Sequence, residues 1–310
     1  MSTKIKNNGL TRNCFMLTVE TMPICVEQIS VDEWTSAVFK KNHLEVEVLR
    51  LDKIHPVISG NKWFKLKYHL AEALDGKYTT LVTWGGAYSN HIVATAFAAR
   101  SAGLRSVGIV RGERAMHLSH TLQSCETLGM ELHFIPRDAY AKKDDPASLA
   151  GMTKKFPAAY FIPEGGSGEK GIRGSMEILS TIQLQQYTHL ACAVGTGTMY
   201  RGLVNAAFSG QQVIGIAVLK GMRDLLIDGM ISHDYHFGGY AKRTDELIAF
   251  MNALYLESGI PVDFVYNAKL FYAVKDLANK NHFPPGSRIL IIHSGGLQGN
   301  LSLLPRTLNF

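Results

Sequence analysis

From residue 79 onward, short apolar runs alternate with helical patterns, and this alternation leaves few folds open to the chain. Continuous apolar runs are typical of strands in parallel sheets that are covered on both faces. Neighbouring parallel strands need a long crossover between them, usually a helix. We therefore predict an α/β protein with open, twisted, mostly parallel sheets. The predicted strands are "TTLVTW" (79–84), "SVGIVR" (106–111), "ELHFI" (131–135), "AAYFI" (158–162), "HLACAV" (189–194), "QVIGIAVL" (212–219) and "RILIIHS" (288–294). The predicted helices include "SNHIVATAFAARSAG" (89–103), "LSHTLQSCETLG" (118–129) and "MYRGLVNAAFS" (199–209).

Two glycine- and proline-rich stretches, "PEGGSGEKGIRG" (163–174) and "FPPGS" (283–287), interrupt this alternation. A chain of 310 residues is long enough for two domains of ordinary size. We interpret the first stretch as the crossing between two α/β units. The predicted units are a small inserted domain, residues 67–163, and a larger domain formed by residues 1–66 plus 164–310.

The net charge of +6 and the isoelectric point near 9.0 raise the question of an acidic partner. Basic residues are scattered along the chain and form only pairs, such as Lys40-Lys41 and Lys142-Lys143. Nucleic-acid binding needs a concentrated stripe of positive charge, so no nucleic-acid partner is expected. No apolar run approaches the roughly 20 residues needed to span a bilayer, so no membrane span is expected.

The four cysteines, Cys14, Cys25, Cys125 and Cys192, are widely separated and form no CxxC pair. Zinc sites and redox motifs need thiols at short spacing, so we expect no metal site and a reducing compartment. Residues 1–22 lack the apolar core of a secretory signal, and we interpret them as an extension of the domain. A weak organellar transit peptide and a translation start placed too early are the alternatives. A cytoplasmic location is favoured.

Four glycine-rich segments each follow a predicted strand. In open α/β sheets, ligands bind outside the carboxyl ends of the strands. Glycines let the backbone approach a ligand closely, and free N–H groups at a helix start bind anions. The predicted ligand-binding loops are therefore "TWGGAYSNH" (83–91), "PEGGSGEKG" (163–171), "AVGTGTMYRG" (193–202) and "IIHSGGLQGN" (291–300).

The segment "VGTGTMYRG" places Gly195, Thr196, Gly197 and Thr198 between a strand and a helix, a pattern typical of a phosphate cup. It does not match the dinucleotide fingerprint, because Tyr200 stands where a glycine or alanine is required. It also lacks the Gly-Lys-Ser/Thr end of a nucleotide P-loop. A single monophosphate suits the segment better than a pyrophosphate, and a simple tight turn is the structural alternative.

The segment "SGNKWFKLKY" (59–68) carries three lysines, Lys62, Lys65 and Lys67. Taken alone, any of them is best explained as a solvated cation. Pyridoxal phosphate, however, needs an anion-binding nest for its ester phosphate and an amine for a Schiff base. The coexistence of Lys62 with a phosphate cup and three further glycine loops favours a pyridoxal-phosphate protein.

Together, the motifs "SGNKWFKLKY", "GGAYSNH", "GTGTMYRGL", "FVYNAK" and "HSGG" resemble those of the D-cysteine desulfhydrase/1-aminocyclopropane-1-carboxylate (ACC) deaminase family. Members of this family are pyridoxal-phosphate enzymes with the tryptophan synthase β-subunit-like fold (fold type II), which is commonly dimeric. The resemblance runs in consistent order from about residue 44 to residue 303. It implies two α/β domains of this fold, pyridoxal 5′-phosphate as cofactor, a small amino acid as substrate and a homodimer.

The resemblance assigns roles around the cofactor to several residues. Lys62 is implied to form the Schiff base, with Asn61 shaping the same pocket and Lys65 placing its ammonium against the phosphate. Ser89 is implied to contact the substrate carboxylate or to act as a nucleophile, and Asn90 to hydrogen-bond the 3′-oxygen of the pyridine ring. From the residues alone, Lys65 is nearly as well explained as a solvated cation, and Ser89 also suits a helix N-cap.

By the same resemblance, the cup from Gly195 to Thr198 holds the phosphate. Tyr240 in "FGGYAK" and Tyr266 in "FVYNAK" match positions near the substrate, where a phenol can hydrogen-bond the substrate or assist proton transfer. The context of Tyr266 is recognisable on both sides, whereas Tyr240 is equally well explained as an aromatic residue between domains.

Two positions depart from the members that open the ring of ACC. Those members resemble one another in a glutamate directly after the tyrosine, which can pair with the pyridine nitrogen, whereas this chain has Asn267. They also carry a leucine where this chain has Ser294. Desulfhydrase-type members favour small hydroxylated residues at both positions, so Ser294 fits their pattern and Asn267 fits neither.

We therefore expect β-elimination from a small amino acid, with D-cysteine as the leading candidate and pyruvate, ammonia and sulfide as products. Lys62 would remove the α-proton, and the cofactor ring would delocalise the remaining charge. A good leaving group tolerates the weaker electron sink that Asn267 implies. The alternative activity is ACC deaminase, which yields 2-oxobutanoate and ammonia. A non-catalytic binder of pyridoxal phosphate or of a nucleotide is the remaining alternative.

Overall fold

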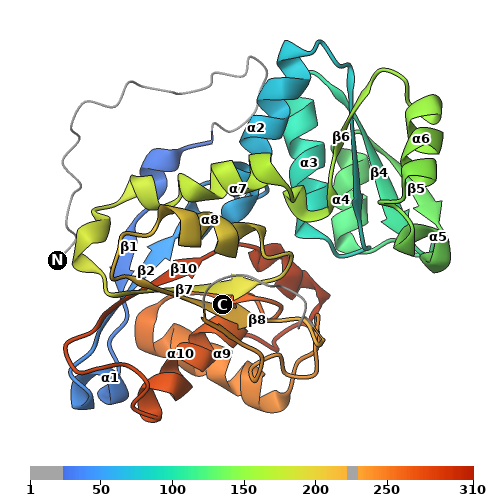
Figure 1. Cartoon of the computed structure of the whole chain (residues 1–310). Coiled ribbons are helices and arrows are strands. Elements are labelled where there is room, and N and C mark those ends of the chain that lie inside the picture. The colour runs from blue at the N-terminus through green and yellow to red at the C-terminus, as the bar shows by residue number, and fades with distance from the viewer. Residues whose placement is uncertain (1–23, 222–229) are drawn as a thin grey trace.

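Two sheets organise the computed structural model of the chain, which describes residues 24–221 and 230–310 (Figure 1). Residues 1–22, interpreted above as an extension, lie outside the described part. The larger sheet has the strand order β1-β2-β10-β7-β8-β9, and the smaller sheet has the order β5-β4-β3-β6. β1 runs antiparallel to β2, and all other neighbouring strands of these sheets are parallel. The predicted α/β class with mostly parallel sheets is confirmed.

Each apolar run predicted as a strand forms one. The strands are β1 (Val31–Glu33), β2 (Glu45–Arg50), β3 (Thr80–Gly85), β4 (Arg105–Arg111), β5 (Met130–Ile135), β6 (Ala159–Ile162), β7 (His189–Val194), β8 (Gln212–Ala217), β9 (Met230–Ser232) and β10 (Arg288–His293). The α-helices are α1 (Ala37–Lys41), α2 (Asn61–Asp75), α3 (Asn90–Ser101), α4 (His120–Thr127), α5 (Arg137–Ala141), α6 (Pro146–Lys155), α7 (Glu169–Met176), α8 (Thr198–Ala206), α9 (Asp245–Ser258) and α10 (Asn267–Asn279). Short 3-10 turns connect several of these elements.

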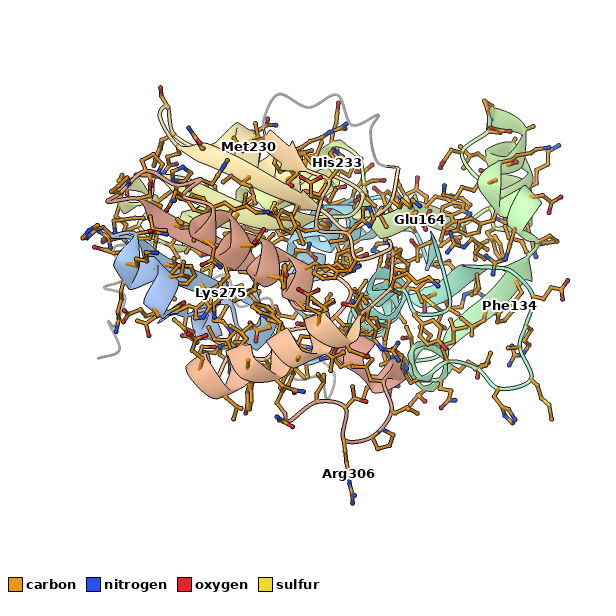
Figure 2. The ribbon with its side chains drawn as sticks, turned by 90° about the horizontal axis from the view of Figure 1, so that it is seen from below. Phe134, Glu164, Met230, His233, Lys275 and Arg306 are labelled. Carbon is orange, nitrogen blue, oxygen red and sulfur yellow. The ribbon has the colours of Figure 1, made fainter. Side chains whose placement is uncertain are left out.

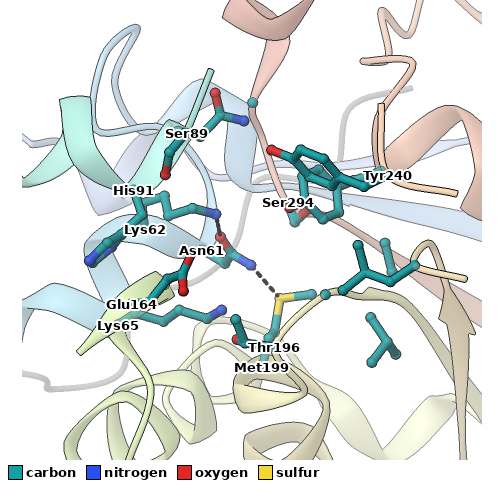
Figure 3. Close-up of a pocket in the computed structure, with 18 of the residues that line it drawn as sticks. Asn61, Lys62, Lys65, Ser89, His91, Glu164, Thr196, Met199, Tyr240 and Ser294 are labelled. Carbon is teal, nitrogen blue, oxygen red and sulfur yellow. Dashed lines mark hydrogen bonds between the residues drawn. The ribbon is translucent and has the colours of Figure 1, made fainter. Parts of the chain in front are cut away.

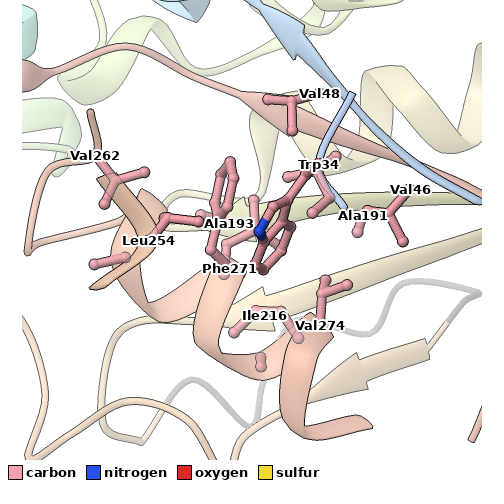
Figure 4. Packing of buried hydrophobic residues seen from close by; sticks show 14 of the residues in the cluster. Trp34, Val46, Val48, Ala191, Ala193, Ile216, Leu254, Val262, Phe271 and Val274 are labelled. Atoms are coloured by element: carbon pink, nitrogen blue, oxygen red, sulfur yellow. The ribbon is translucent and has the colours of Figure 1, made fainter. Parts of the chain in front are cut away.

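Both faces of the larger sheet are buried, which explains why its central strands are continuous apolar runs. Along β7, Cys192 packs into the core on the α8 side, whereas Ala191 and Ala193 pack into the core on the α10 side. In the second core, the rings of Trp34 and Phe271 lie with their centroids 5.2 Å apart (Figure 4). Figure 1 shows α9 and α10 on one side of this sheet and α7 and α8 on the other.

The smaller sheet is covered by α3 and α4 on one face and by α5 and α6 on the other. Helix α2 contributes to both cores: Phe64 packs into the core of the larger sheet, and Leu66 and Leu70 pack into that of the smaller sheet. The predicted domain boundary, between residues 66 and 67, therefore falls inside α2. The division into two domains stays a prediction. In Figure 2, Glu164 lies between the smaller sheet, marked by Phe134, and the larger one.

None of the helices in residues 24–221 and 230–310 combines the length and the apolar character that a bilayer crossing needs.

Candidate active site

A cavity of about 330 Å³ is lined by residues from both sheets, at the carboxyl ends of their strands. All four predicted ligand-binding loops contribute to it: Ser89 follows β3, Glu164 follows β6, Gly195 follows β7 and Ser294 follows β10. Parallel strands end at the same edge of a sheet, and ligands of open α/β folds bind there. Lys62 reaches into this cavity from α2 (Figure 3).

Lys62 lies in the first turn of α2, two residues after Gly60, whose backbone closely contacts the backbone of Ser294. Gly60 has a φ of 65°, and a Cβ there would lie 1.8 Å from the carbonyl oxygen of Ser294, so this position requires glycine. The half-buried Lys62 donates a hydrogen bond from Nζ to Oδ1 of Asn61, 2.7 Å away. Burial lowers the pKa of Lys62 to about 8, while Asp263 acts in the opposite direction. More of this amine is neutral near pH 7 than of an ordinary lysine, which suits a nucleophile or a base.

Lys65 lies one turn further along α2 and is 6% exposed. Burial and repulsion from Lys62 lower its pKa to about 7. No carboxylate in the described part of the chain forms an ion pair with Lys65, whereas Lys67 is paired with Glu177. Figure 3 shows the Lys65 side chain pointing toward Thr196 in the predicted phosphate cup. A buried amine without a counter-ion suits an anionic ligand at this point.

The predicted phosphate cup is the turn that leads from β7 into α8. Gly197 has a φ of 78°, and the hydroxyl oxygens of Thr196 and Thr198 are hydrogen-bonded at 2.9 Å. A Cβ on Gly195 would lie 3.1 Å from Cε1 of Tyr266, so glycine keeps this approach open. The first N–H groups of α8 have no partner within the helix. One of the two hydroxyls donates to the other, so the turn can offer the remaining hydroxyl proton and several N–H groups to one anion.

Helix α3 begins at the same cavity, directly after Ser89. The Ser89 hydroxyl accepts a hydrogen bond from the backbone N–H of Ile92 at 3.4 Å, which is the geometry of an N-cap. Its own proton is not needed for that contact and can be donated to a ligand. Asn90 is 9% exposed, and within the described residues its Oδ1 has no hydrogen-bond partner. Buried amides without partners are unusual in folded proteins, so Asn90 is a candidate ligand-binding residue.

His91, to which the sequence assigned no chemistry, is held neutral beside these residues. The Thr83 hydroxyl donates to the carbonyl oxygen of Ile162 at 2.9 Å, so at 2.8 Å it must accept from Nε2 of His91. The proton of the neutral ring is therefore on Nε2. Burial, together with Lys62 and Lys65, holds the pKa of His91 well below its usual value.

The two predicted tyrosines face the cavity together. The rings of Tyr240 and Tyr266 form a T-shaped pair, with centroids 6.1 Å apart and an angle of 70° between planes. Burial raises the pKa of both phenols, and Tyr240 and Asp263 help raise that of Tyr266 well above its usual value. Both phenols therefore stay protonated and act as hydrogen-bond donors rather than as bases.

Asn267 is fully buried and supports the cavity wall, which at this point is formed by Ser294. Its Nδ2 donates to Oδ1 of Asp263 at 2.6 Å and to the carbonyl oxygen of Gly295 at 2.7 Å. Its Oδ1 accepts from the backbone N–H and the hydroxyl of Ser294. Both hydrogens and the oxygen of the Asn267 amide are therefore used in hydrogen bonds within the protein.

The sequence assigned no role to Asp263, Arg111 or Glu164, although Glu164 lies in the predicted loop 163–171. Asp263 is fully buried and accepts hydrogen bonds from the backbone N–H groups of Val265 and Tyr266, which lead into α10. An aspartate just before a helical pattern is an N-cap signal that could have identified it. Arg111 is the last residue of β4, Glu164 follows β6, and both line the cavity. Their position at the carboxyl ends of strands is the available signal, but single charged residues resemble ordinary surface residues.

The side chains of the cavity fit pyridoxal phosphate on chemical grounds. Lys62 supplies an amine with a lowered pKa, and Lys65 supplies a buried amine without a carboxylate partner. The turn from Thr196 to Thr198 offers donors to a phosphate, and Asn90 lines the cavity, where its Nδ2 can donate to a polar ring substituent. No group of His, Cys, Asp and Glu side chains in the described ranges could hold a metal ion.

Known proteins are similar to this chain along most of its length. The family model "Pyridoxal-phosphate dependent enzyme" matches residues 35–295. A "Putative 1-aminocyclopropane-1-carboxylate deaminase" of Pyrococcus abyssi is 31% identical over 83% of this chain and 86% of the relative. A mitochondrial "Bifunctional D-cysteine desulfhydrase/1-aminocyclopropane-1-carboxylate deaminase" of Arabidopsis thaliana is 28% identical over 83% of this chain and 74% of the relative. A crystal structure of an "ACC deaminase homologue" superimposes with a TM-score of 0.76 and 26% identity, covering 89% of this chain and 94% of that one.

Proposed function

The chain belongs to the pyridoxal-phosphate dependent enzyme family, and on this basis we propose that it catalyses β-elimination from D-cysteine or a related D-amino acid. The overall reaction converts D-cysteine and water into pyruvate, ammonia and hydrogen sulfide. The C–S bond and the C–N bond break, and the water oxygen becomes the carbonyl oxygen of pyruvate.

The observation that carries this proposal is the neutral cavity wall formed by Ser294, which the amide of Asn267 supports from behind. A carboxylate at this place would pair with the pyridine nitrogen and strengthen the electron sink. The amide of Asn267 carries no charge, and its hydrogens are bound to Asp263 and Gly295. A weaker electron sink suits the loss of a good leaving group such as hydrosulfide better than the opening of a carbon–carbon bond.

When bound, pyridoxal phosphate withdraws electrons from the α-carbon of an attached amino acid. Lys62 is proposed to take the α-proton, because burial brings the pKa of its amine to about 8 and Asn61 holds its Nζ at 2.7 Å. Lys65 and the turn from Thr196 to Thr198 are proposed to hold the phosphate. A phosphate near Lys65 favours its ammonium form and opposes the effect of burial on the pKa of that amine.

The substrate is proposed to lie between α3 and the two tyrosines. The Ser89 hydroxyl and the N–H groups of the first turn of α3 can bind its carboxylate. Asn90 is proposed to donate to the 3′-oxygen of the cofactor ring. Tyr266 and Tyr240 stay protonated, so they can hydrogen-bond the departing sulfur without giving up a proton.

ACC deaminase activity is the second candidate. The Pyrococcus abyssi relative is named for it, and the Arabidopsis thaliana relative is named for both activities. ACC has no α-hydrogen, so Lys62 cannot start that reaction by removing one. A different first step would be needed, with a nucleophile or acid acting on the ring. Ser89, Tyr240 and Tyr266 line the cavity and could provide that nucleophile or acid.

A substrate panel tests the choice between these activities. The purified holoenzyme is given D-cysteine, L-cysteine, D-serine and ACC, and the release of 2-oxo acid, ammonia and sulfide is measured. We expect D-cysteine to be the fastest substrate, with equal amounts of pyruvate and sulfide. Faster turnover of ACC than of any cysteine would overturn this order. Lys62→Ala should abolish turnover, while Lys67→Ala, in the same helix, should retain it.

We also propose a homodimer in a reducing compartment, the cytoplasm. The homodimer is supported by the resemblance to a family whose fold is commonly dimeric. The compartment is supported by Cys25, Cys125 and Cys192, which form no disulfide with one another in the described part of the chain. Sedimentation of the holoenzyme tests the first proposal, and localisation of the tagged full chain tests the second.

A further inference from the structure

A buried lysine in α10 binds two backbone carbonyls. Lys269 is fully buried, and its Nζ donates hydrogen bonds to the carbonyl oxygens of His236 at 2.9 Å and Gly239 at 2.7 Å. Across residues 24–221 and 230–310, no acidic side chain forms an ion pair with it. Burial lowers the pKa of Lys269 to about 8, with Asp263 acting in the opposite direction, so the amine is largely protonated at pH 7. Burying a charge is unfavourable unless its hydrogen bonds are made. The two hydrogen bonds of Lys269 therefore indicate that its ammonium has a structural role.

Both carbonyls belong to residues 236–241, a segment with an unusual backbone that we call the strap. Within the strap, Phe237, Gly238, Gly239 and Ala241 have φ angles of 48°, 89°, 117° and 52°. Residues with a Cβ rarely adopt this left-handed region. The strap therefore needs contacts that hold it in place.

The strap is closed by its own backbone and attached to α10 by side chains. The Gly239 N–H donates to the His236 carbonyl at 2.9 Å, and the Lys242 N–H donates to the Gly239 carbonyl at 3.2 Å. The attachments are the amine of Lys269 and the ring of Phe237, which meets an aromatic ring of α10 edge-on at 4.9 Å. Without the amine, each carbonyl would keep one partner, but the strap would lose these hydrogen bonds to the helix.

The strap carries Tyr240 to the cavity. Tyr240 is 40% exposed, and its ring packs against Tyr266, which stands three residues before Lys269. Figure 3 shows Tyr240 beside Ser294, on the side of the cavity away from Lys65. One end of α10 thus holds both the strap and the tyrosine against which Tyr240 packs.

We propose that Lys269 is a positioning residue that clamps the strap to α10 and so fixes the Tyr240 phenol over the substrate side of the cavity. An ammonium suits this role because its three N–H donors can bind two carbonyls at once. The inference rests on the proposed function, in which Tyr240 contacts the substrate. A side chain of similar length without donors would leave the strap free to move relative to α10.

Hydrogen exchange in the holoenzyme tests the clamp without any need for turnover. Lys269→Met removes the amine and keeps the apolar stem, and Lys275→Met is the matched control in the same helix, where the lysine pairs with Glu257. We expect the amides of residues 233–244 to exchange about tenfold faster in Lys269→Met and at the wild-type rate in Lys275→Met. Unchanged exchange in Lys269→Met overturns the clamp.

Kinetics test whether the clamp acts through Tyr240. We expect Lys269→Met to lower kcat/KM for the best substrate by about tenfold or more, with the bound cofactor and its affinity unchanged. The double variant Lys269→Met/Tyr240→Phe should then be no worse than the poorer single variant. Positioning through Tyr240 is overturned if the losses of kcat/KM in the two single variants multiply in the double variant. It is also overturned if weaker cofactor binding accounts for the loss of kcat/KM in Lys269→Met.

Two further outcomes are distinguishable. If Lys269→Met does not unfold cooperatively, Lys269→Gln is used instead, because its side chain keeps N–H donors. The exchange rate of the strap amides in Lys269→Gln should lie between the rates in the control and in Lys269→Met. A wild-type enzyme that turns over no amino acid of the panel would overturn the proposed function. Hydrogen exchange of the strap would still decide the clamp in that case.

Discussion

The amide oxygen of Asn267 accepts two hydrogen bonds from Ser294, one from its backbone N–H at 3.0 Å and one from its hydroxyl at 3.3 Å. The amide cannot rotate without breaking contacts to Asp263 and Gly295, so the hydroxyl proton of Ser294 is directed into the protein. The Ser294 oxygen then presents lone pairs to the cavity. The residue after Tyr266 therefore shapes the cavity through Ser294.

Asn267→Asp is expected to destabilise the fold in a pH-dependent way. The change puts a carboxylate oxygen where Nδ2 now donates to Asp263, within a fully buried site. Burial and the neighbouring carboxylate will raise the pKa of the new group above its unfolded value of about 4. Stability is then retained below the unfolded pKa and lost as the pH rises through the folded pKa. We expect a loss of about 3 kcal/mol at pH 8 that shrinks toward pH 5, measured by urea unfolding.

Asn279→Asp is the control for this change, since Asn279 is exposed in the last turn of the same helix. Its effect should stay within about 0.5 kcal/mol at both pH values. A loss at Asn267→Asp that is equally large at pH 5 and pH 8 would contradict the ionisation argument.

The strands were predictable where burial on both faces leaves a continuous apolar run, as in residues 189–194 and 288–294. The strand β2 is absent from the predicted set, although it lies inside the larger sheet between β1 and β10. Its sequence alternates Glu45 and Glu47 with valines, because the glutamates lie at the less buried positions of the strand. A search for continuous apolar runs passes over such a strand.

The motifs predicted the loops around the cavity, because glycines after strands are a local signal. They did not predict that Asn267 acts through Ser294. That relationship depends on Asp263, four residues earlier in the chain, and on Gly295, which the fold brings to Asn267 from a distant segment. The burial of Lys65 was also invisible, since it depends on how α2 packs against neighbouring elements.

Lys62 is expected to react with added pyridoxal phosphate in a pH-dependent way. Only the neutral amine attacks an aldehyde, and burial lowers the pKa of Lys62 to about 8. When pyridoxal phosphate is added to cofactor-free protein, the product that it forms with Lys62 absorbs visible light. The rate at which this absorbance appears should rise with pH and reach half its maximum near pH 8. Borohydride followed by mass spectrometry should place the pyridoxyl group on Lys62, and Lys62→Ala should show neither signal. A midpoint near pH 10.5, the ordinary lysine value, would contradict the effect of burial.

Gly60→Ala is expected to disrupt the start of α2. A Cβ at Gly60 would lie 1.8 Å from the Ser294 carbonyl oxygen, so the segment that contains Gly60 must move away from the loop that contains Ser294. Gly103→Ala is the matched control, because Gly103 has a φ of 69° but no atom within 4 Å of the added Cβ. We expect losses of about 3 kcal/mol or more for Gly60→Ala and about 1 kcal/mol for Gly103→Ala in thermal unfolding. Equal losses would mean that backbone strain alone accounts for both.

Lys65→Met is expected to stabilise the cofactor-free protein and to weaken its affinity for pyridoxal phosphate. Without an anion, burial and Lys62 lower the pKa of Lys65 to about 7, so the charged form is unfavourable in the folded state. A lowered lysine pKa means that the folded state gains stability as the pH rises from the folded value toward the unfolded one. The gain from Lys65→Met should therefore be about 2 kcal/mol at pH 6 and should fade toward pH 10.

The same amine should favour the phosphate once the cofactor is bound. We expect Lys65→Met to raise the Kd for pyridoxal phosphate by about 10- to 100-fold, because a charge-assisted hydrogen bond is lost. The Kd for pyridoxal, which has no phosphate, should be unchanged. Lys67→Met, which removes the partner of Glu177, is the control and should change neither affinity. An equal loss for both ligands in Lys65→Met would show that Lys65 shapes the cavity rather than binding the phosphate.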